Sequence, residues 1–368
     1  MRKTIAASLV AAAALLPGSS AGAQGTVIVP GPTDRVSNVG TRGAEWLNIG
    51  IGARQQGMGT ASVASSEGPS AIFWNPANVA GREGVSAFAS HMRLYGNSGI
   101  TMIAGAVSLP IGAGALAIGA QQFSSGEMER TTERAPFGGD PVAGGNFSYT
   151  GLAVTAQYAR AITDRFNAAV GVRFAQEGID VARNGFTGVD FSTRFRTGLY
   201  GLTVGGTVQN IGTSGRFSGA GVNRSINVAR DNGNATGNSI SVQYNTRQVD
   251  MPTTFRLGVQ SSLLGDPEAL FGQNEQHSLM AEAAFTDPLD GSTKPAFGME
   301  YTFRHFAALR AGKRWLNEPN AAWGFSDGLA FGGGLRVPLG GRKLNFDYAF
   351  VNMGELQNNQ VISLDIAF

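Results

Sequence analysis

The sequence predicts an all-β protein: a transmembrane antiparallel β-barrel of about 14 strands with an N-terminal hatch segment that plugs its interior. Three observations lead there: a short apolar leader, apolar residues that alternate with small or polar ones, and connections of alternating length. The 368 residues suffice for one large barrel. The chain has 53 glycines and 42% hydrophobic residues, a composition that favours strands and turns and is too apolar for disorder.

The N-terminus has the features of a secretory signal peptide. Arg2 and Lys3 precede an apolar run over 5–16, and small residues at 21–23 offer a cleavage site before Gln24. The run is too short to span about 30 Å of hydrocarbon as a helix, which argues against a membrane anchor. We therefore expect a cleaved signal peptide and an exported mature chain.

The charge balance excludes one class of partner. Cleavage would remove two basic residues and no acidic one, which leaves 26 of each. A neutral exported chain without a basic cluster gives no support for nucleic-acid binding.

The alternation is clearest near the C-terminus. Leu344, Phe346 and Tyr348 share one face of a strand, whereas Asn345 and Asp347 share the other. In most segments the second face is small, polar or charged, and aromatic residues gather at strand ends, as in barrels with a lipid-facing outside and a polar inside. A soluble sandwich would give the same alternation in any one strand. The leader and the connection lengths favour the barrel.

The strands and their connections set the expected orientation. We expect strands at 85–95, 101–110, 114–124, 146–162, 166–178, 187–196, 199–210, 252–264, 277–286, 294–304, 306–315, 327–338, 343–352 and 360–368. Connections after even-numbered strands are mostly short, and long ones follow odd-numbered strands; the exceptions are a short first loop and a longer turn at 265–276. This rule is typical of outer-membrane barrels, with the short turns in the periplasm. The cell outer membrane of a Gram-negative type is the expected location.

The last strand carries a candidate assembly signal. Ile362, Leu364, Ile366 and the terminal Phe368 fall on one face. This pattern resembles the signal that the barrel-insertion machinery recognises. We therefore expect that machinery and outer-membrane lipid as partners.

Residues 24–84 precede the first strand and contain the sequence SAIFWNPANVAG. Here Phe73 and Trp74 stand directly before Asn75 and Pro76, which interrupt helices and strands. The segment is too apolar for a free tail and too irregular for a membrane strand, and a 14-stranded barrel has room inside for it. A periplasmic cap under the barrel is the alternative.

The expected domains follow from these features. They are a signal peptide at 1–23, a hatch segment at 24–84 and an outer-membrane barrel at 85–368. Phe73, Trp74, Asn75 and Pro76 are the hatch motif and the candidate ligand pocket.

Several charged residues fall on expected lumen faces. They are Arg173, Glu177, Arg256, Glu282, Glu300, Arg310, Arg314, Asp347 and Asp365. Such charges either line a pore or pair with one another to hold the hatch. We favour pairing, because an unpaired charge inside the barrel is costly.

No pattern in the sequence indicates catalysis or metal binding. The chain has no cysteine, and its three histidines, His91, His277 and His305, are far apart and form no metal-ligand motif. The glycine clusters lack the spacing of a phosphate-binding loop. We therefore expect no enzyme activity, no catalytic residues, no metal and no cofactor.

Residues 52–81 resemble the N-terminal signature of the PorV/PorQ family, within the larger group of FadL-like outer-membrane barrels. The matching features are Gly-Ala-Arg at 52–54, Met-Gly at 58–59 and Trp-Asn-Pro-Ala at 74–77, and the stretches at 208–212 and 347–350 also look familial. One departure concerns an acidic pair that relatives often carry before the aromatic turn, where this chain has only Glu67.

This resemblance implies two functions. A PorV-type barrel would bind exported proteins and pass them on in type IX secretion and surface attachment, through the loops at 125–145 and 211–251. Its partners would be type IX secretion components and cargo proteins. The alternative is a FadL-like, hatch-gated channel for uptake of hydrophobic small molecules, with a pocket near Phe73 and Trp74. The small and charged lumen faces weigh modestly against a wide apolar channel, and a purely structural barrel is a third hypothesis.

Overall fold

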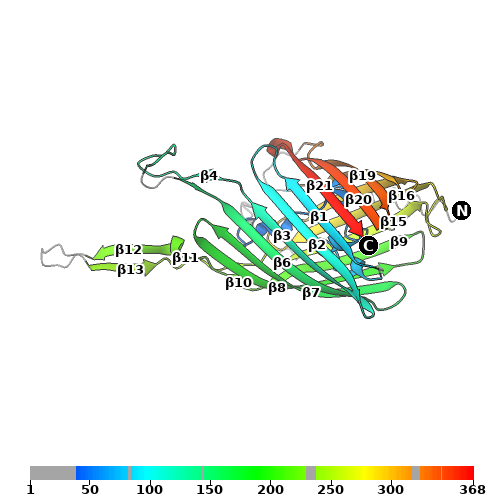
Figure 1. Cartoon of the computed structure of the whole chain (residues 1–368), viewed down its shortest axis with the longest axis horizontal. Helices are drawn as coiled ribbons and strands as arrows, with labels where there is room; N and C mark the ends of the chain where they lie inside the picture. The colour runs from blue at the N-terminus through cyan, green and yellow to red at the C-terminus, as the bar shows by residue number, and fades with distance from the viewer. Residues whose placement is uncertain (1–38, 82–83, 142–144, 229–237, 317–323, 341) are drawn as a thin grey trace, which may run out of the picture. The chain divides into compact units, whose positions relative to one another are not determined.

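The chain forms a closed antiparallel barrel of 14 strands (Figure 1). The computed structural model describes residues 39–81, 84–141, 145–228, 238–316, 324–340 and 342–368. The barrel strands are β1 (Ser86–Arg93), β2 (Thr101–Ile111), β3 (Gly114–Ser124), β6 (Tyr149–Ala161), β7 (Phe166–Ile179), β8 (Ala182–Arg196), β9 (Leu202–Gly212), β15 (Thr254–Leu264), β16 (His277–Pro288), β17 (Lys294–Phe303), β18 (Ala307–Arg314), β19 (Leu329–Leu339), β20 (Arg342–Asn352) and β21 (Asn358–Ala367). Each pairs with its neighbours along the chain, and β1 pairs with β21 to close the ring.

The expected strands are confirmed, with one clear shift. β8 begins at Ala182, earlier than expected, so a two-residue turn joins β7 to β8. Asp180 in this turn has φ 53°, a left-handed conformation that aspartate tolerates because its short side chain bonds to nearby backbone. The long loop expected before residue 187 was therefore wrong.

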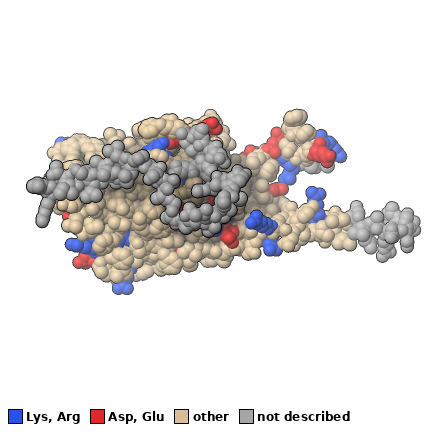
Figure 2. Space-filling view, turned by 180° about the vertical axis from the view of Figure 1, so that it is seen from behind, with Lys and Arg blue, Asp and Glu red and all other residues tan. Residues whose placement is uncertain are grey.

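The two faces of the barrel wall differ as the alternation predicts. In β6, Leu152 and Val154 are exposed, whereas Ala153, Thr155 and Gln157 are buried. Figure 2 shows a broad area of the described surface without charged side chains. An apolar outer face of this kind suits lipid. In the described part of the chain, no helix combines the length and the hydropathy that a membrane span requires.

Short strands occupy two of the connections on the long-loop end of the barrel. They are β4 (Met128–Glu129), β5 (Asn146–Phe147), β10 (Ser214–Gly215), β11 (Ser218–Gly219), β12 (Asn223–Val228), β13 (Asn238–Gln243) and β14 (Val249–Asp250), with the turns η4 (Ala220–Val222) and, before β21, η5 (Gly354–Leu356). β12 and β13 pair as an antiparallel hairpin. The loop expected at 211–251 thus contains regular structure that its polar composition did not predict.

Residues 39–81, here called the N-terminal segment, contain four short helical turns. They are η1 (Glu45–Asn48), α2 (Ala53–Gly57), η2 (Pro69–Phe73) and η3 (Pro76–Val79). Pro69 and Pro76 stand at the first position of their turns, where the missing N–H costs nothing. The expected signal peptide and residues 24–38 of the expected hatch lie outside the described residues.

Glycines on the barrel wall have no side chain and so allow the N-terminal segment to approach the wall closely. An added Cβ at Gly151 of β6 would lie 2.2 Å from Trp46, and one at Gly298 of β17 would lie 2.4 Å from the Met58 carbonyl oxygen. These two strands stand at distant places in the ring of strands. The segment therefore contacts inward-facing residues from widely separated parts of the barrel wall.

Candidate functional site

The four residues of the expected hatch motif are all buried. Trp74 Nε1 donates a hydrogen bond to the Ile51 carbonyl at 2.7 Å, and the Arg256 guanidinium lies 5.4 Å from the Trp74 ring centroid. Phe73 packs against Phe88 with ring centroids 6.2 Å apart. The motif is packed core: none of the four cavities described below is lined by its residues.

Asn75 ties the motif to two other parts of the molecule. Its amide nitrogen donates to the carbonyl of Val63 at 3.0 Å and to that of Thr193 on β8 at 2.9 Å. Its side-chain oxygen accepts from the Ala77 N–H at 3.2 Å, which caps η3. A single buried amide thus joins the aromatic turn, the preceding loop and the barrel wall.

A charge network joins α2 to four barrel strands. Arg54 forms a bidentate pair with Glu300 of β17, with Nε–Oε2 at 2.8 Å and Nη2–Oε1 at 3.0 Å. Arg310 of β18 bonds the same carboxylate at 2.5 Å and Asp347 of β20 at 2.7 Å. Arg336 of β19 approaches Glu300 at 3.7 Å. The Arg54, Glu300, Arg310 and Asp347 side chains are mostly buried, where fork-shaped pairing satisfies both charges.

Two further carboxylates hold the backbone of the N-terminal segment. Glu282 of β16 accepts from the N–H groups of Ala64 at 2.8 Å and Ser65 at 2.9 Å. Glu177 of β7 accepts from the Ala44 N–H at 2.8 Å. These N–H groups lie outside regular secondary structure, so barrel side chains supply the acceptors that a helix or sheet would otherwise provide.

Much of the expected pairing among the inward charges is found, but one carboxylate partner was not expected and two arginines bond to groups other than carboxylates. Arg173 pairs with Asp190 at 2.8 Å. Asp190 was not among the expected inward charges, although it continues the inward alternation of β8; the register shift beside it comes from an extra residue on β9, at Gln209 and Asn210. Arg256 bonds the Phe73 carbonyl instead of a carboxylate, and Arg314 donates to Met353 Sδ at 3.0 Å.

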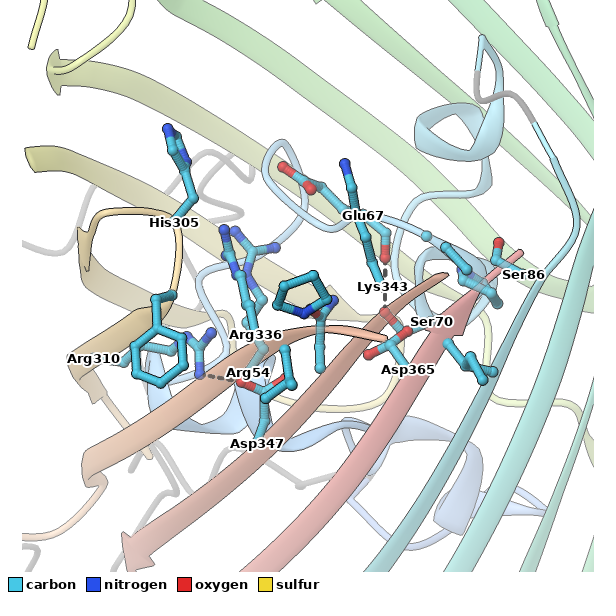
Figure 3. Close-up of a pocket in the computed structure, with 18 of the residues that line it drawn as sticks. Arg54, Glu67, Ser70, Ser86, His305, Arg310, Arg336, Lys343, Asp347 and Asp365 are labelled. Carbon is cyan, nitrogen blue, oxygen red and sulfur yellow. Dashed lines mark hydrogen bonds and ion pairs between the residues drawn. The ribbon is translucent and has the colours of Figure 1, made fainter. Parts of the chain in front are cut away.

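The main cavity, of about 680 Å³, lies at the short-turn end of β17 to β21 (Figure 3). Residues 67–70 of the N-terminal segment form one wall, and the turn at 304–306 forms another. Arg336 and Lys343 reach in from β19 and β20, and Figure 3 shows both side chains directed toward the same space as Glu67. The cavity is lined by charged and apolar groups together, a composition that sequence reasoning did not foresee.

Smaller cavities lie at both ends of the barrel. Two of about 420 and 650 Å³ share Asp164, Arg194 and Arg196 near the short turns. One of about 130 Å³ lies near the long loops, between residues 41–42, 247–250 and 289–290. Cavities therefore flank the N-terminal segment at both of its ends.

The residues of the expected assembly signal lie on β21 and at the terminus. Ile362, Leu364 and Phe368 are exposed, and Ile366 is half-buried. The Arg342 guanidinium lies 4.8 Å from the Phe368 ring centroid. The described residues contain no group of three or more His, Cys, Asp or Glu arranged to hold a metal ion.

No family model matches the chain, and no curated protein matches it. Several solved structures do. The toluene transporter TbuX of Ralstonia pickettii is 14% identical, covers 87% of this chain and 98% of its own, and has a TM-score of 0.53. The toluene transporter TodX of Pseudomonas putida is 12% identical, with 86% and 97% covered and a TM-score of 0.53. The CymD monoaromatic hydrocarbon channel is 12% identical, with 87% and 98% covered and a TM-score of 0.53.

These likenesses establish the fold of the chain. The neighbours are toluene transporters and a monoaromatic hydrocarbon channel. No comparison points to the PorV/PorQ family.

Proposed function

We propose that this chain is an outer-membrane channel that admits hydrophobic small molecules and uses its N-terminal segment as the hatch. The observation that carries the proposal is the way this segment is held. Arg54 and the backbone at Ala64 and Ser65 are bound by carboxylates from β17 and β16. Removing one partner from a buried ion pair is strongly destabilising, so a ligand that competes for one of these charges would loosen the segment.

The fold supports the same proposal. The barrel is shared with transporters of toluene and monoaromatic hydrocarbons. A barrel whose interior is filled by protein conducts only when the filling moves, so movement of the segment would open the path. The cavities near both ends of the segment could bind a molecule before and after that movement.

A disulfide lock tests the hatch directly. An added Cβ at Gly57 would lie 3.6 Å from the Ala349 Cβ, within the spacing that disulfides adopt. The Gly332 Cα, 3.1 Å from the same added atom, must give way slightly. The chain has no native cysteine, so the double variant Gly57→Cys/Ala349→Cys would contain a single disulfide.

We expect oxidation of this variant in the outer membrane to stop uptake of labelled toluene, and reduction to restore it. The single variants control for the substitutions. Ser225→Cys/Ser241→Cys joins exposed register partners on β12 and β13, away from the described cavities, and it should transport in both redox states. Normal uptake by the fully oxidised lock would refute the hatch.

A second candidate, the PorV-type role in type IX secretion, is favoured by the β12–β13 hairpin. Ile226 and Ile240 are register partners there, and each is about half exposed. Exposed apolar pairs on a surface loop suit a protein partner. Cargo proteins and type IX components are the expected partners under this hypothesis.

Purification from native outer membranes in mild detergent separates the two functions. Stoichiometric secretion components or cargo, lost when the hairpin is replaced by a short glycine-serine turn, would support the secretion role. Recovery of the barrel alone with bound apolar molecules would support the channel.

A further inference from the structure

We propose that the main cavity, at the short-turn end, is a binding site for a small organic carboxylate with a compact apolar body. This inference deepens the proposed function by naming the ligand class of one cavity. Only the link between ligand binding and passage through the barrel rests on that function. Anion binding itself stands on the cavity's own residues.

The cavity contains cationic groups with donors to spare. Lys343 forms no ion pair within the described chain, and the Arg304 guanidinium lies 5.2 Å from the Phe303 ring centroid. Arg336 has one long approach to Glu300, at 3.7 Å, and its side chain is 32% exposed. Ammonium and guanidinium groups that line a half-open cavity are suited to bind a carboxylate, and the arginine fork can hold both oxygens.

Apolar groups line the same cavity beside these cations. Phe306 is half exposed, Val337 is 39% exposed, and Pro69 and Pro338 add rigid apolar surface. The volume of about 680 Å³ falls among those of small-molecule sites. An inorganic anion would leave this apolar lining unused, whereas an aromatic or short aliphatic carboxylate would cover it.

The turn that carries Arg304 and His305 is strained in a way that fits a functional role. Their φ angles are 49° and 53°, so both central residues of the turn from Phe303 to Phe306 are left-handed. Asn-Gly is the usual solution there, because these residues adopt that conformation at least cost. The chain instead places two long nitrogen-bearing side chains at the mouth of the cavity.

The acidic residues of the cavity determine how binding connects to the N-terminal segment. Asp347 is already engaged by Arg310 at 2.7 Å. Glu67 belongs to the N-terminal segment and points toward the space that Lys343 and Arg336 also face (Figure 3). An incoming carboxylate would repel Glu67, the one of these groups that belongs to the segment. Binding should therefore loosen the segment on this side.

Benzoate binding to the purified full-length barrel in detergent, measured by calorimetry, tests the inference. Toluene and benzylamine, the neutral and cationic counterparts, are titrated at the same pH. We expect benzoate to bind best, with affinity that falls as salt rises. Lys343→Met and Arg336→Met should each weaken benzoate binding by about tenfold, the effect of losing one charge-assisted hydrogen bond.

Glu67→Gln should change the affinity in the opposite direction, by about threefold, because it removes a repelling charge. Arg93→Met, at an exposed site on β1, is the matched control and should leave benzoate binding unchanged. Lys343→Arg should restore binding, and heat-modifiable gel mobility confirms that each variant has formed a barrel.

Equal binding of toluene and benzoate, or benzoate binding that is insensitive to both Lys343→Met and Arg336→Met, would overturn the inference. The result is separable from the hatch test. A barrel that binds benzoate as described but ignores the Gly57–Ala349 lock would refute the channel and leave the anion site standing. A disulfide lock that stops uptake in a barrel that does not bind benzoate would support the channel and refute the anion site.

Discussion

Arg54 and Glu300, 246 positions apart in the sequence, form a bidentate ion pair with Nε–Oε2 at 2.8 Å and Nη2–Oε1 at 3.0 Å. The pair joins the one α-helical turn in the described N-terminal segment to β17 of the barrel. Arg310 bonds the same carboxylate from the neighbouring strand. The Glu300 carboxylate therefore pairs with the N-terminal segment through Arg54 and with the neighbouring wall strand through Arg310.

Arg54→Met should release this side of the N-terminal segment. Breaking a buried pair typically costs about 3–5 kcal/mol, although Arg310 remains to compensate Glu300 here. We expect much faster hydrogen exchange of the amides in residues 52–66, measured by mass spectrometry. Arg130→Met removes an exposed pair with Asp180 and should have no comparable effect. Unchanged protection in Arg54→Met would mean that the pair does not hold the segment.

Gly312→Ala should displace the segment by steric conflict. Its added Cβ would lie 2.1 Å from the Met58 carbonyl carbon, so backbone must move. We expect a barrel that still assembles, with faster exchange around residues 57–60 and raised toluene uptake. Gly105→Ala is the matched control, because its Cβ would meet nothing closer than the Phe88 carbonyl oxygen at 3.6 Å. Similar uptake in the two variants would contradict the expectation.

Trp74→Phe should destabilise the aromatic turn. The indole N–H donates to the buried Ile51 carbonyl at 2.7 Å, and phenylalanine leaves that carbonyl without its donor. The expected cost is about 1–3 kcal/mol, measured as a lower free energy of local opening from exchange of residues 50–52. Trp315→Phe alters a half-exposed indole elsewhere and should leave that region unchanged. Equal opening energies in both proteins would show that the hydrogen bond contributes nothing.

The folded position of η1 should become less stable as pH rises. Burial, with Asp290 nearby, raises the pKa of Glu45 to about 8, while Asn48 and Arg42 oppose the shift. A raised pKa means that the folded protein keeps a proton which the unfolded chain releases above its ordinary value of 4.5. The stabilisation is therefore complete below that value and is lost as pH rises through about 8. Exchange of residues 44–49, corrected for intrinsic rates, should accelerate across this window, and Glu45→Gln should remove the pH dependence.

Removal of Phe368 tests the expected assembly signal. Its ring is about half exposed at the end of the chain and lies next to Arg342. We expect a several-fold drop in the amount of heat-modifiable barrel in the outer membrane, with unfolded chain accumulating in the periplasm. Phe137→Ala changes a more exposed phenylalanine in a loop and should assemble normally. Normal assembly without Phe368 would refute its role as a signal.

Local sequence pattern was enough to assign the two faces of the barrel wall. Side chains alternate with period two in any strand, so residues such as Leu152 and Gln157 could be assigned to opposite faces from local pattern alone. Turn residues and connection lengths then located all 14 strands. The inward position of Glu300 and Arg310 followed from the same alternation.

Which inward residues meet depends on the closed barrel and not on local pattern. Arg54 could not be matched to Glu300, nor Glu282 to the backbone of Ala64, because ring closure and the path of the N-terminal segment set those distances. The bulge at Gln209 and Asn210 interrupted the alternation of β9, and the hatch motif proved to be packed core. The main cavity formed elsewhere, around Arg336 and Lys343, because its walls come from segments that only the closed barrel brings together.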